Sequence, residues 1–482
     1  LGSQATSASC LSGILEAGEL GSLVGMHFVD FRLVTMNLLS ALASGSAAAE
    51  STSPTPFMLW GSVIIFLVAY AFIATEKINR VAVVSAGAAA MILIGATGAD
   101  EAFYSHATGI DWNVIFLLLG MMIIVGVIHK TGLFEFLAVK AIQLAKGNPR
   151  QAFVYILILV ASASALLDNV TTILLAVPMT FLVAKYLKVN PVPFILGEVF
   201  VSNIGGASTL IGDPPNIIIA SKAGLDFNAF LVHMAPIVVL VMIVIVPLLV
   251  LMFKKQLVNS AEDRAAVMTL DASSYITDKK LLIKSLSVLS IVIVAFVLHS
   301  VLHLEPSIVA MMGAGLLVLL SNLKPEQFAK DVEWGTLVFF AGLFVMVGAL
   351  VNVGALNLVA DMIGNAVGDN AALAAGSVVV VSALVSGIVD NIPYVASMTP
   401  VIHQLNDQIT TITNDGLWWA LALGADFGGN MTIVGASANV VAIGLAHAAG
   451  HKITFWQFAK YGVPVTLVST LLALPYVLIR YF

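Results

Sequence analysis

Long runs of apolar residues alternate with short polar stretches along most of the chain. Clear cases are FMLWGSVIIFLVAYAFIA (57–74), VIFLLLGMMIIVGVI (114–128) and APIVVLVMIVIVPLLVLMF (235–253). A helix needs about 20 apolar residues to cross ~30 Å of hydrocarbon, and these runs approach or reach that length. The pattern predicts an all-α polytopic membrane protein, which we expect in the inner membrane of a bacterial or archaeal cell.

Two parts of the chain repeat one another. DNVTTILLAVP (168–178) returns as DNIPYVASMTP (390–400), and the pattern GGxxTxxGxxxN occurs at 205–216 and again at 428–439. One tryptophan and three glycines recur at a displacement of 222, so that Trp112, Gly120, Gly126 and Gly132 match Trp334, Gly342, Gly348 and Gly354. Because the matches are colinear, they indicate two homologous halves.

The repeat suggests a division of the chain. We expect the first transmembrane repeat at 57–253, a cytoplasmic linker at 254–280 and the second transmembrane repeat at 281–482. Residues 1–55 are rich in Ser, Ala and Gly. They resemble either a signal-like leader or a poorly ordered segment, and they are left out of the predicted fold.

The placement of basic residues gives the orientation. If the first helix runs inward, most Lys and Arg residues, Arg80 among them, fall on the cytoplasmic side. Residues 152–187 then form a re-entrant hairpin with Asp168 and Asn169 at its tip. Residues 372–410 form a second hairpin that enters from outside. The repeats are therefore expected to be inverted, an arrangement found in many secondary transporters.

The stretch SNIGGASTLIGDPPNIIIAS (202–221) should break a helix inside an apolar segment. Glycines permit a close turn, and two adjacent prolines cannot donate backbone hydrogen bonds. Such backbone is tolerated within a membrane only where protein or a water-filled cavity satisfies it, so we expect it to line a site. The second half breaks at the matching place but lacks Asp-Pro-Pro, and it carries Asp426 near the position where the first half has Asn203. The site should therefore be chemically asymmetric.

The candidate site residues are polar side chains and glycines of these motifs. Four are carboxylates that could exchange a proton or ligate Na⁺, because charge in lipid is costly and marks function: Asp168, Asp213, Asp390 and Asp426. The others are Asn169, Thr171, Asn203, Gly205, Gly206, Thr209, Gly212, Asn216, Asn391, Asn430, Thr432, Gly435 and Asn439. A coupling Na⁺ is expected near Asn169, Gly212, Asn391 and Gly435. The structural alternative is that the aspartates cap helices and that the amides and hydroxyls only satisfy broken backbone.

Composition narrows the class of protein further. The chain is 60% hydrophobic and 10% charged, whereas soluble domains carry about 25% charged residues. Cys10 is the only cysteine, which excludes disulfide frameworks and cysteine zinc sites. HExxH, GxSxG and GxxxxGK[ST] are absent from the sequence, and four aspartates in two repeats fit poorly with a single protease dyad. We expect no enzyme activity, no cofactor and no nucleic-acid partner.

Three segments carry a resemblance to a known family. SNIGGASTLIGDPPNIIIAS, DNIPYVASMTPVI and LWWALALGADFGGNMTIVGASANVVAIG resemble ArsB/NhaD-type permeases of the ion transporter superfamily, in particular the branch of arsenite permeases and the melanosomal P protein. The resemblance covers about 57–482. It implies hairpins and unwound helices around the substrate, elevator-like movement and a homodimer.

The leading functional hypothesis is a secondary transporter that exports arsenite or antimonite, driven by an ion gradient or the membrane potential. Arsenite is mainly a neutral triol at pH 7, which Asn and Thr side chains could bind without cysteine. A soluble ATPase partner is implied if the protein works as an arsenite pump. The alternatives are a Na⁺/H⁺ antiporter of the NhaD type, a carrier for another inorganic or organic anion, and a passive channel.

Overall fold

The computed structural model describes residues 54–75, 78–412 and 414–482. The predicted leader, including Cys10, lies outside these ranges apart from its last two residues. Within them the chain forms helices and no strands, and eight of these helices are long and apolar enough to cross a membrane. The expected all-α polytopic fold is confirmed.

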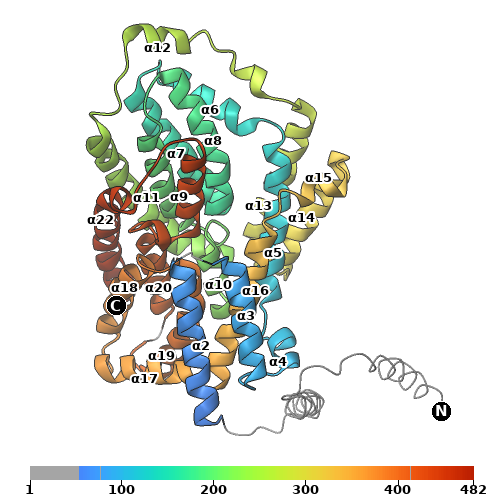
Figure 1. Cartoon of the computed structure of the whole chain (residues 1–482), viewed down its shortest axis with the longest axis vertical. Coiled ribbons are helices and arrows are strands. Elements are labelled where there is room, and N and C mark those ends of the chain that lie inside the picture. The colour runs from blue at the N-terminus through green and yellow to red at the C-terminus, as the bar shows by residue number, and fades with distance from the viewer. Residues whose placement is uncertain (1–53, 76–77, 413) are drawn as a thin grey trace, which may run out of the picture. The chain divides into compact units, whose positions relative to one another are not determined.

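The same series of helices occurs in both halves (Figure 1). The first half contains α2 (Pro56–Thr75), α3 (Arg80–Leu93), α4 (Ala99–Tyr104), α5 (Trp112–His129), α6 (Leu133–Leu144), α7 (Pro149–Leu166), α8 (Asn169–Leu187), α9 (Val192–Gly206), α10 (Pro214–Ala223) and α11 (Phe227–Phe253). The connecting segment contains α12 (Ala261–Val267) and η1 (Ala272–Tyr275). The second half contains α13 (Lys279–Leu302), α14 (Pro306–Ser321), α15 (Pro325–Ala329), α16 (Trp334–Asn352), α17 (Ala355–Val367), α18 (Ala371–Ser386), α19 (Asn391–Gln408), α20 (Gly416–Gly428), η2 (Ile433–Gly435), α21 (Ser437–Ala448) and α22 (Phe455–Tyr481).

The equivalence extends to where helices begin. Helices α16 to α19 each start 222 residues after α5 to α8. The residue before α6 is Gly132 and the residue before α17 is Gly354, with nearly equal positive φ values of 75° and 76°. Only glycine adopts this left-handed backbone without a steric penalty, so the same sharp turn is built twice.

Apolar side chains cover the outer helices as well as the interior. Trp60 on α2 and Ile291 on α13 are 59% and 58% exposed in the isolated chain. Such surfaces suit a hydrocarbon solvent, in which all backbone groups of a helix are satisfied internally. Several helices begin at a polar cap outside the apolar run. Asp111 and Asp226 accept hydrogen bonds from Val114 and Ala229 in the first turns of α5 and α11.

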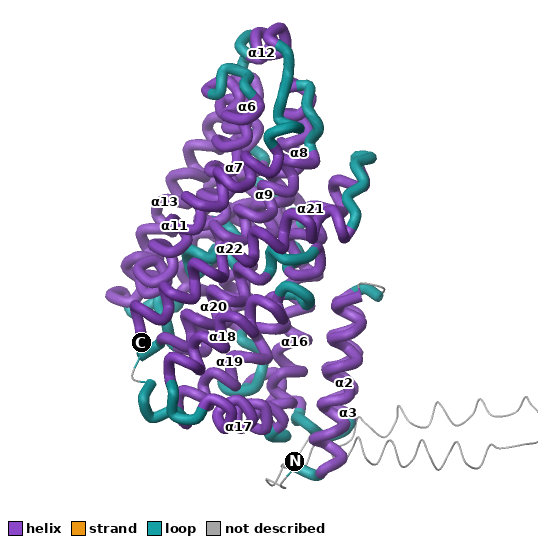
Figure 2. Tube along the Cα trace, turned by 90° about the vertical axis from the view of Figure 1, so that its left-hand side faces the viewer, coloured by secondary structure: helices purple, strands orange, loops and turns teal. Residues whose placement is uncertain are grey.

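The two halves are packed through reciprocal helix pairs. Helix α5 packs against α14 while α16 packs against α3, and α8 packs against α21 while α19 packs against α10. The hairpin of α7 and α8 reaches the centre from the end that carries α6 and α12, whereas α18 and α19 reach it from the end that carries α17 (Figure 1, Figure 2). The halves are therefore inverted repeats, each with a re-entrant hairpin and a broken helix.

The inverted arrangement predicts that α12 and the turn after α17 face opposite sides of the membrane. We expect single cysteines at Glu262 and Asp369, both exposed, to react with an impermeant maleimide from opposite sides when Cys10 is replaced by Ser. The measurement is labelling of intact cells against inverted vesicles. Modification of both positions from the same side would rule out the topology.

Candidate functional site

The two hairpin tips carry an aspartate that starts the returning helix. Asp168 accepts hydrogen bonds from the backbone N–H of Thr171 (2.8 Å) and from its hydroxyl (2.5 Å). Asp390 accepts from the N–H of Ile392 (3.1 Å) and from the Ser437 hydroxyl (2.6 Å). Both aspartates therefore do cap helices, as the structural alternative expected, but Asp390 also reaches another element.

The broken helices stop and restart close to the hairpin tips. In the first half α9 ends at Gly206 and α10 begins at Pro214, and in the second α20 ends at Gly428 and α21 begins at Ser437. Pro214 and Pro215 occupy the first turn of α10, where a backbone N–H would have no helical partner in any case. The prolines thus begin a helix here, whereas the sequence argument gave them the role of breaking one.

Side chains satisfy the backbone that the breaks set free. Asn216 donates to the carbonyl of Thr209 (3.1 Å), and Asn439 donates to the carbonyl of Thr432 (2.8 Å). The Thr209 hydroxyl donates to Ala165 (2.6 Å) and the Thr432 hydroxyl to Gly387 (2.7 Å), both at carbonyls of the adjacent hairpin. These contacts give Thr209 and Thr432 a structural role, and Thr171 has one as well at the helix cap of Asp168.

The first break also depends on backbone packing at two glycines. A Cβ atom on Gly212 would lie 2.4 Å from the carbonyl oxygen of Gly206, and a Cβ on Gly206 would lie 2.4 Å from the oxygen of Gly212. A Cβ on Gly435 would likewise lie 2.7 Å from the oxygen of Gly429. Gly205 and Gly428 press against the carbonyls of Ala161 and Ala383 in the hairpins. These glycines permit close approach and have no side chain to bind a ligand.

A buried amide network joins both hairpin tips to both breaks. Asn169 donates to Asn203 (3.1 Å) and to Asp213 (2.8 Å), and Asn391 of the other tip donates to the second oxygen of Asp213 (3.5 Å). Asn203 donates in turn to Asn430 and Asn439 of the second half, at 3.0 Å each. Asp213 precedes α10, but its side chain makes no capping hydrogen bond to that helix. The carboxylate of Asp213 is therefore available for the contacts with the two asparagines.

Several buried oxygens in this network or beside it have no hydrogen-bond donor. They are Oδ1 of Asn169, Oδ1 of Asn216 and both carboxylate oxygens of Asp426. Asp213 and Asp426 are fully buried, and no Lys or Arg side chain within the described ranges forms an ion pair with either. Buried charge without a partner is strongly unfavourable, so this arrangement suits a proton or a Na⁺ ion ligated by oxygens.

A cavity of about 500 Å³ opens beside the second hairpin tip, between α2, α3, α16 and α21. Arg80 lines it and donates to the Ser437 hydroxyl (2.6 Å), and its guanidinium lies 3.9 Å from Asp390. From the sequence, Arg80 was expected only to be one of the basic residues on the cytoplasmic side. Arg80 begins α3, and the contacts of its side chain with Asp390 and Ser437 are a feature that the sequence did not predict.

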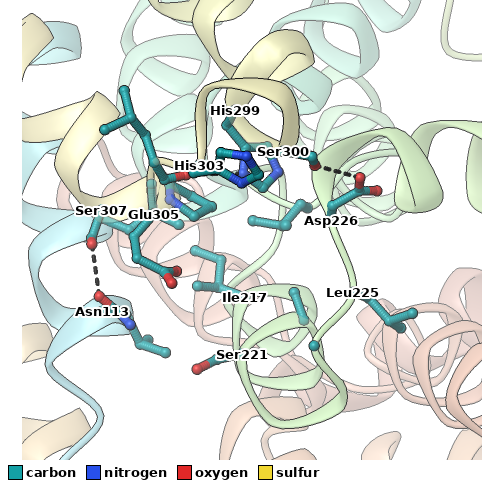
Figure 3. A pocket seen from close by; sticks show the side chains of 17 residues that line it. Asn113, Ile217, Ser221, Leu225, Asp226, His299, Ser300, His303, Glu305 and Ser307 are labelled. Atoms are coloured by element: carbon teal, nitrogen blue, oxygen red, sulfur yellow. Dashed lines mark hydrogen bonds between the residues drawn. The ribbon is translucent and has the colours of Figure 1, made fainter.

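A second cavity of about 530 Å³ occupies the equivalent place in the other half, between α5, α10, α13 and α14 (Figure 3). Ser307 donates to Asn113 (2.8 Å) and Ser300 donates to Asp226 (2.6 Å) in its wall. Burial raises the pKa of Asp226, but its hydrogen bonds outweigh burial and the pKa is lowered from the usual value. The cavity has no Lys or Arg in its lining and includes none of the candidate site residues.

The structure thus sorts the predicted residues into groups. It brings Asn169, Asn203, Asp213, Asn391, Asn430 and Asn439 into one hydrogen-bonded network. Asn216 and Asp426 supply the unpaired oxygens. Sequence reasoning missed Arg80 and Ser437. No sequence motif distinguishes Arg80 from other basic residues at helix ends. Ser437, in contrast, stands where the first repeat has Pro214, and this difference between the repeats can be seen in the sequence.

Two inverted repeats whose hairpins and broken helices enclose a polar centre define a membrane transporter. The family follows from comparison with known proteins. Residues 70–424 match the model of the CitMHS citrate transporter family, so the chain belongs to this family of the ion transporter superfamily. It is a multi-pass membrane protein and not an enzyme.

The relatives agree with this assignment. An uncharacterized transporter of Mycobacterium tuberculosis is 50% identical over 425 residues, which cover 87% of this chain and 98% of that protein. The 46 kDa membrane protein of Mycobacterium leprae is 48% identical over the same shares. The mouse P protein is 34% identical, with 93% of this chain and 62% of that protein covered. The YdaH transporter of Alcanivorax borkumensis shares the fold, with a TM-score of 0.55, 13% identity and coverage of 88% of this chain and 98% of that chain.

The glycine contact at the first break yields a stability prediction. We expect Gly212→Ala to lower the free energy of unfolding by about 1–3 kcal/mol, because the added methyl group meets backbone that cannot move aside. Gly315→Ala in α14 is the matched control, since a Cβ there has no neighbour within 4 Å. Thermal unfolding of the purified proteins in detergent measures both. Equal melting temperatures for Gly212→Ala and the parent would contradict the packing argument.

Proposed function

We propose that the protein is a secondary transporter that couples movement of a small carboxylate anion to movement of a cation, H⁺ or Na⁺. The observation that carries the proposal is the enclosed network around Asp213 and Asp426. Both hairpin tips and both breaks contribute to it, yet no basic side chain among the described residues is paired with either carboxylate.

The network favours a cation for a simple electrostatic reason. Two carboxylates buried near one another without a basic partner are costly to keep ionised. A proton removes one charge, and a Na⁺ ion balances it while taking oxygen ligands. The unpaired oxygens of Asn169, Asn216 and Asp426 are of the kind that hard cations bind. Cation binding would thus stabilise one arrangement of the hairpin tips, and this would couple movement of the cation to movement of the anion.

The carboxylate substrate is supported by the family and by the chemistry around the network. The family is described as citrate transporters. The amide nitrogen of Asn430 is a buried donor without an acceptor, and Ser437 begins the half-helix α21, whose N-terminus favours anions. A carboxylate could accept from such groups, with its charge offset by the coupling cation.

Arsenite remains the main competing substrate. Six buried asparagines could also bind the hydroxyl groups of a neutral triol. Na⁺/H⁺ exchange without an anion is a further alternative, because the same carboxylates would serve it. The homodimer, the elevator-like movement and a soluble ATPase partner stay predictions from the family resemblance.

Transport by the purified protein in proteoliposomes separates these functions. We expect saturable uptake of labelled citrate above protein-free liposomes, increased by an imposed pH or Na⁺ gradient. Arsenite and ²²Na⁺ are measured in parallel. Flux of arsenite alone would overturn the carboxylate assignment. Na⁺/H⁺ exchange without citrate uptake would favour the antiporter, and gradient-independent, non-saturable flux would indicate a channel.

A second prediction concerns the two buried carboxylates. We expect Asp213→Asn and Asp426→Asn each to reduce gradient-driven accumulation by about tenfold or more, the factor that corresponds to ~1.4 kcal/mol. The purified variants should stay folded, because an amide keeps the size of the side chain. Asp361→Asn is the control, since Asp361 is exposed on α17 and bonds only to glutamines. Unchanged coupling in both site variants would exclude these carboxylates from the coupling step.

A further inference from the structure

Arg80 makes a set of contacts that has no equivalent in the other half. It donates to Ser437 (2.6 Å) and to Thr336 (3.4 Å), and its guanidinium lies 5.3 Å from the centre of the Phe339 ring. The Ser437 hydroxyl in turn donates a hydrogen bond to Asp390 (2.6 Å). Pro306 begins α14, the equivalent of α3, and Pro214 begins α10, the equivalent of α21. Neither proline can replace the guanidinium or the hydroxyl.

The guanidinium is accessible from the cavity. The Arg80 side chain is 33% exposed, whereas that of Asp390 is 11% exposed. The cavity of about 500 Å³ is within the ~300–1,000 Å³ range of small-molecule sites. A ligand that entered it could meet Arg80 directly, without passing through the enclosed amide network.

The charges in this cavity oppose an anion unless a proton arrives as well. Among the described residues its lining contains one positive side chain, Arg80, and two carboxyl groups, Asp390 and Glu333, which together carry a net charge of −1 when both carboxyl groups are ionised. Glu333 accepts from Thr336 (3.0 Å), while its other oxygen is buried without a donor. Asp390 occupies the position near the guanidinium that a substrate carboxylate would need.

We propose that Arg80 is the anion-recognition residue of the transporter and that Asp390 competes with the substrate for it. In this scheme a proton binds Asp390, the neutral carboxyl group releases the guanidinium, and a carboxylate of the substrate takes its place beside Ser437 at the start of α21. The inference rests on the proposed function for its substrate class. It adds the residue that selects the anion and a physical cause for one proton accompanying each anion.

The surroundings of Asp390 are consistent with such an exchange. The ionisable groups that face this part of the structure, from each element packed around it, are Tyr70 of α2, Arg80 of α3, Asp168 of the first tip, Asp213 before α10, Glu333 before α16 and Tyr394 of α19. Arg80 is the only positively charged group among these described residues. Its release therefore depends on neutralising a carboxyl group and not on a second cationic side chain.

The exchange predicts linked effects on affinity and pH dependence. Two quantities are measured from about pH 7 to pH 9, a range well above the usual pKa of exposed carboxyl groups. They are the KM for citrate in proteoliposomes and the binding of citrate to the purified protein, followed by the shift in melting temperature. In the parent protein the KM should rise by up to about tenfold per pH unit once Asp390 is ionised. Arg80→Gln should raise the KM by about 10- to 100-fold, as expected for loss of charge-assisted hydrogen bonds, and Arg80→Lys by less.

Asp390→Asn distinguishes competition from a merely structural contact. An amide cannot be ionised and does not hold the guanidinium by charge, so this variant should flatten the pH dependence of the KM while citrate still binds. Arg150→Gln is the matched control, because Arg150 is exposed and its side chain bonds only to the carbonyl of Lys254. It should leave both the KM and its pH dependence unchanged.

The outcomes separate this proposal from the proposed function. If the parent transports citrate but Arg80→Gln and Arg80→Lys keep its KM, or Asp390→Asn keeps its pH dependence, the proposal fails and the function stands. If citrate binds in an Arg80-dependent manner but is not transported, the proposal stands and the function fails. If the parent neither binds nor transports citrate, both are overturned.

Discussion

Two helices of this protein stop and restart inside apolar segments, and the freed backbone groups have to find partners where little water is available. The sequence meets this constraint twice with the same device. Asn216 and Asn439 bond back to carbonyls of their own break, while Thr209 and Thr432 bond to carbonyls of the neighbouring hairpin. Each break is thus attached to the hairpin of its own half, and the two tips meet at Asp213, which accepts hydrogen bonds from Asn169 and Asn391.

The backbone of the two repeats is symmetric, but the charged side chains on it are distributed asymmetrically. The centre contains Asp213 and Asp426 surrounded by amides, while Arg80 lies beside one hairpin tip only. A cation and an anion can therefore be recognised at different places within one polar region. Because Asp390 caps α19 and also faces Arg80, a change of charge there acts on the hairpin itself.

Much of this architecture could be predicted from sequence because it depends on repetition. A displacement of 222 residues located the hairpins and one of 223 located the breaks, and the asparagines of the repeated motifs do meet in the structure. Contacts between different segments were less accessible. Arg80 looks like any cation at a helix end, and only the fold shows that α3 places it beside Ser437. Pro214 and Pro215 were expected to break a helix, but α9 already ends at Gly206 and the prolines begin α10. The sequence pattern did not show where the preceding helix ends, and this decides which role a proline has.

The reciprocal pairing of helices has a consequence for how the chain is assembled. Helix α5 completes its packing against α14, and α3 against α16, so these helices cannot bury the surfaces involved before both halves have been synthesised. Early helices must enter the lipid before their partners are made, since α14 begins 194 residues after α5 (306 − 112) and α16 begins 254 residues after α3 (334 − 80). An ancestral single repeat would have met the same requirement by pairing with an oppositely inserted copy of itself, and fusion of two such copies would remove the dependence on protein concentration.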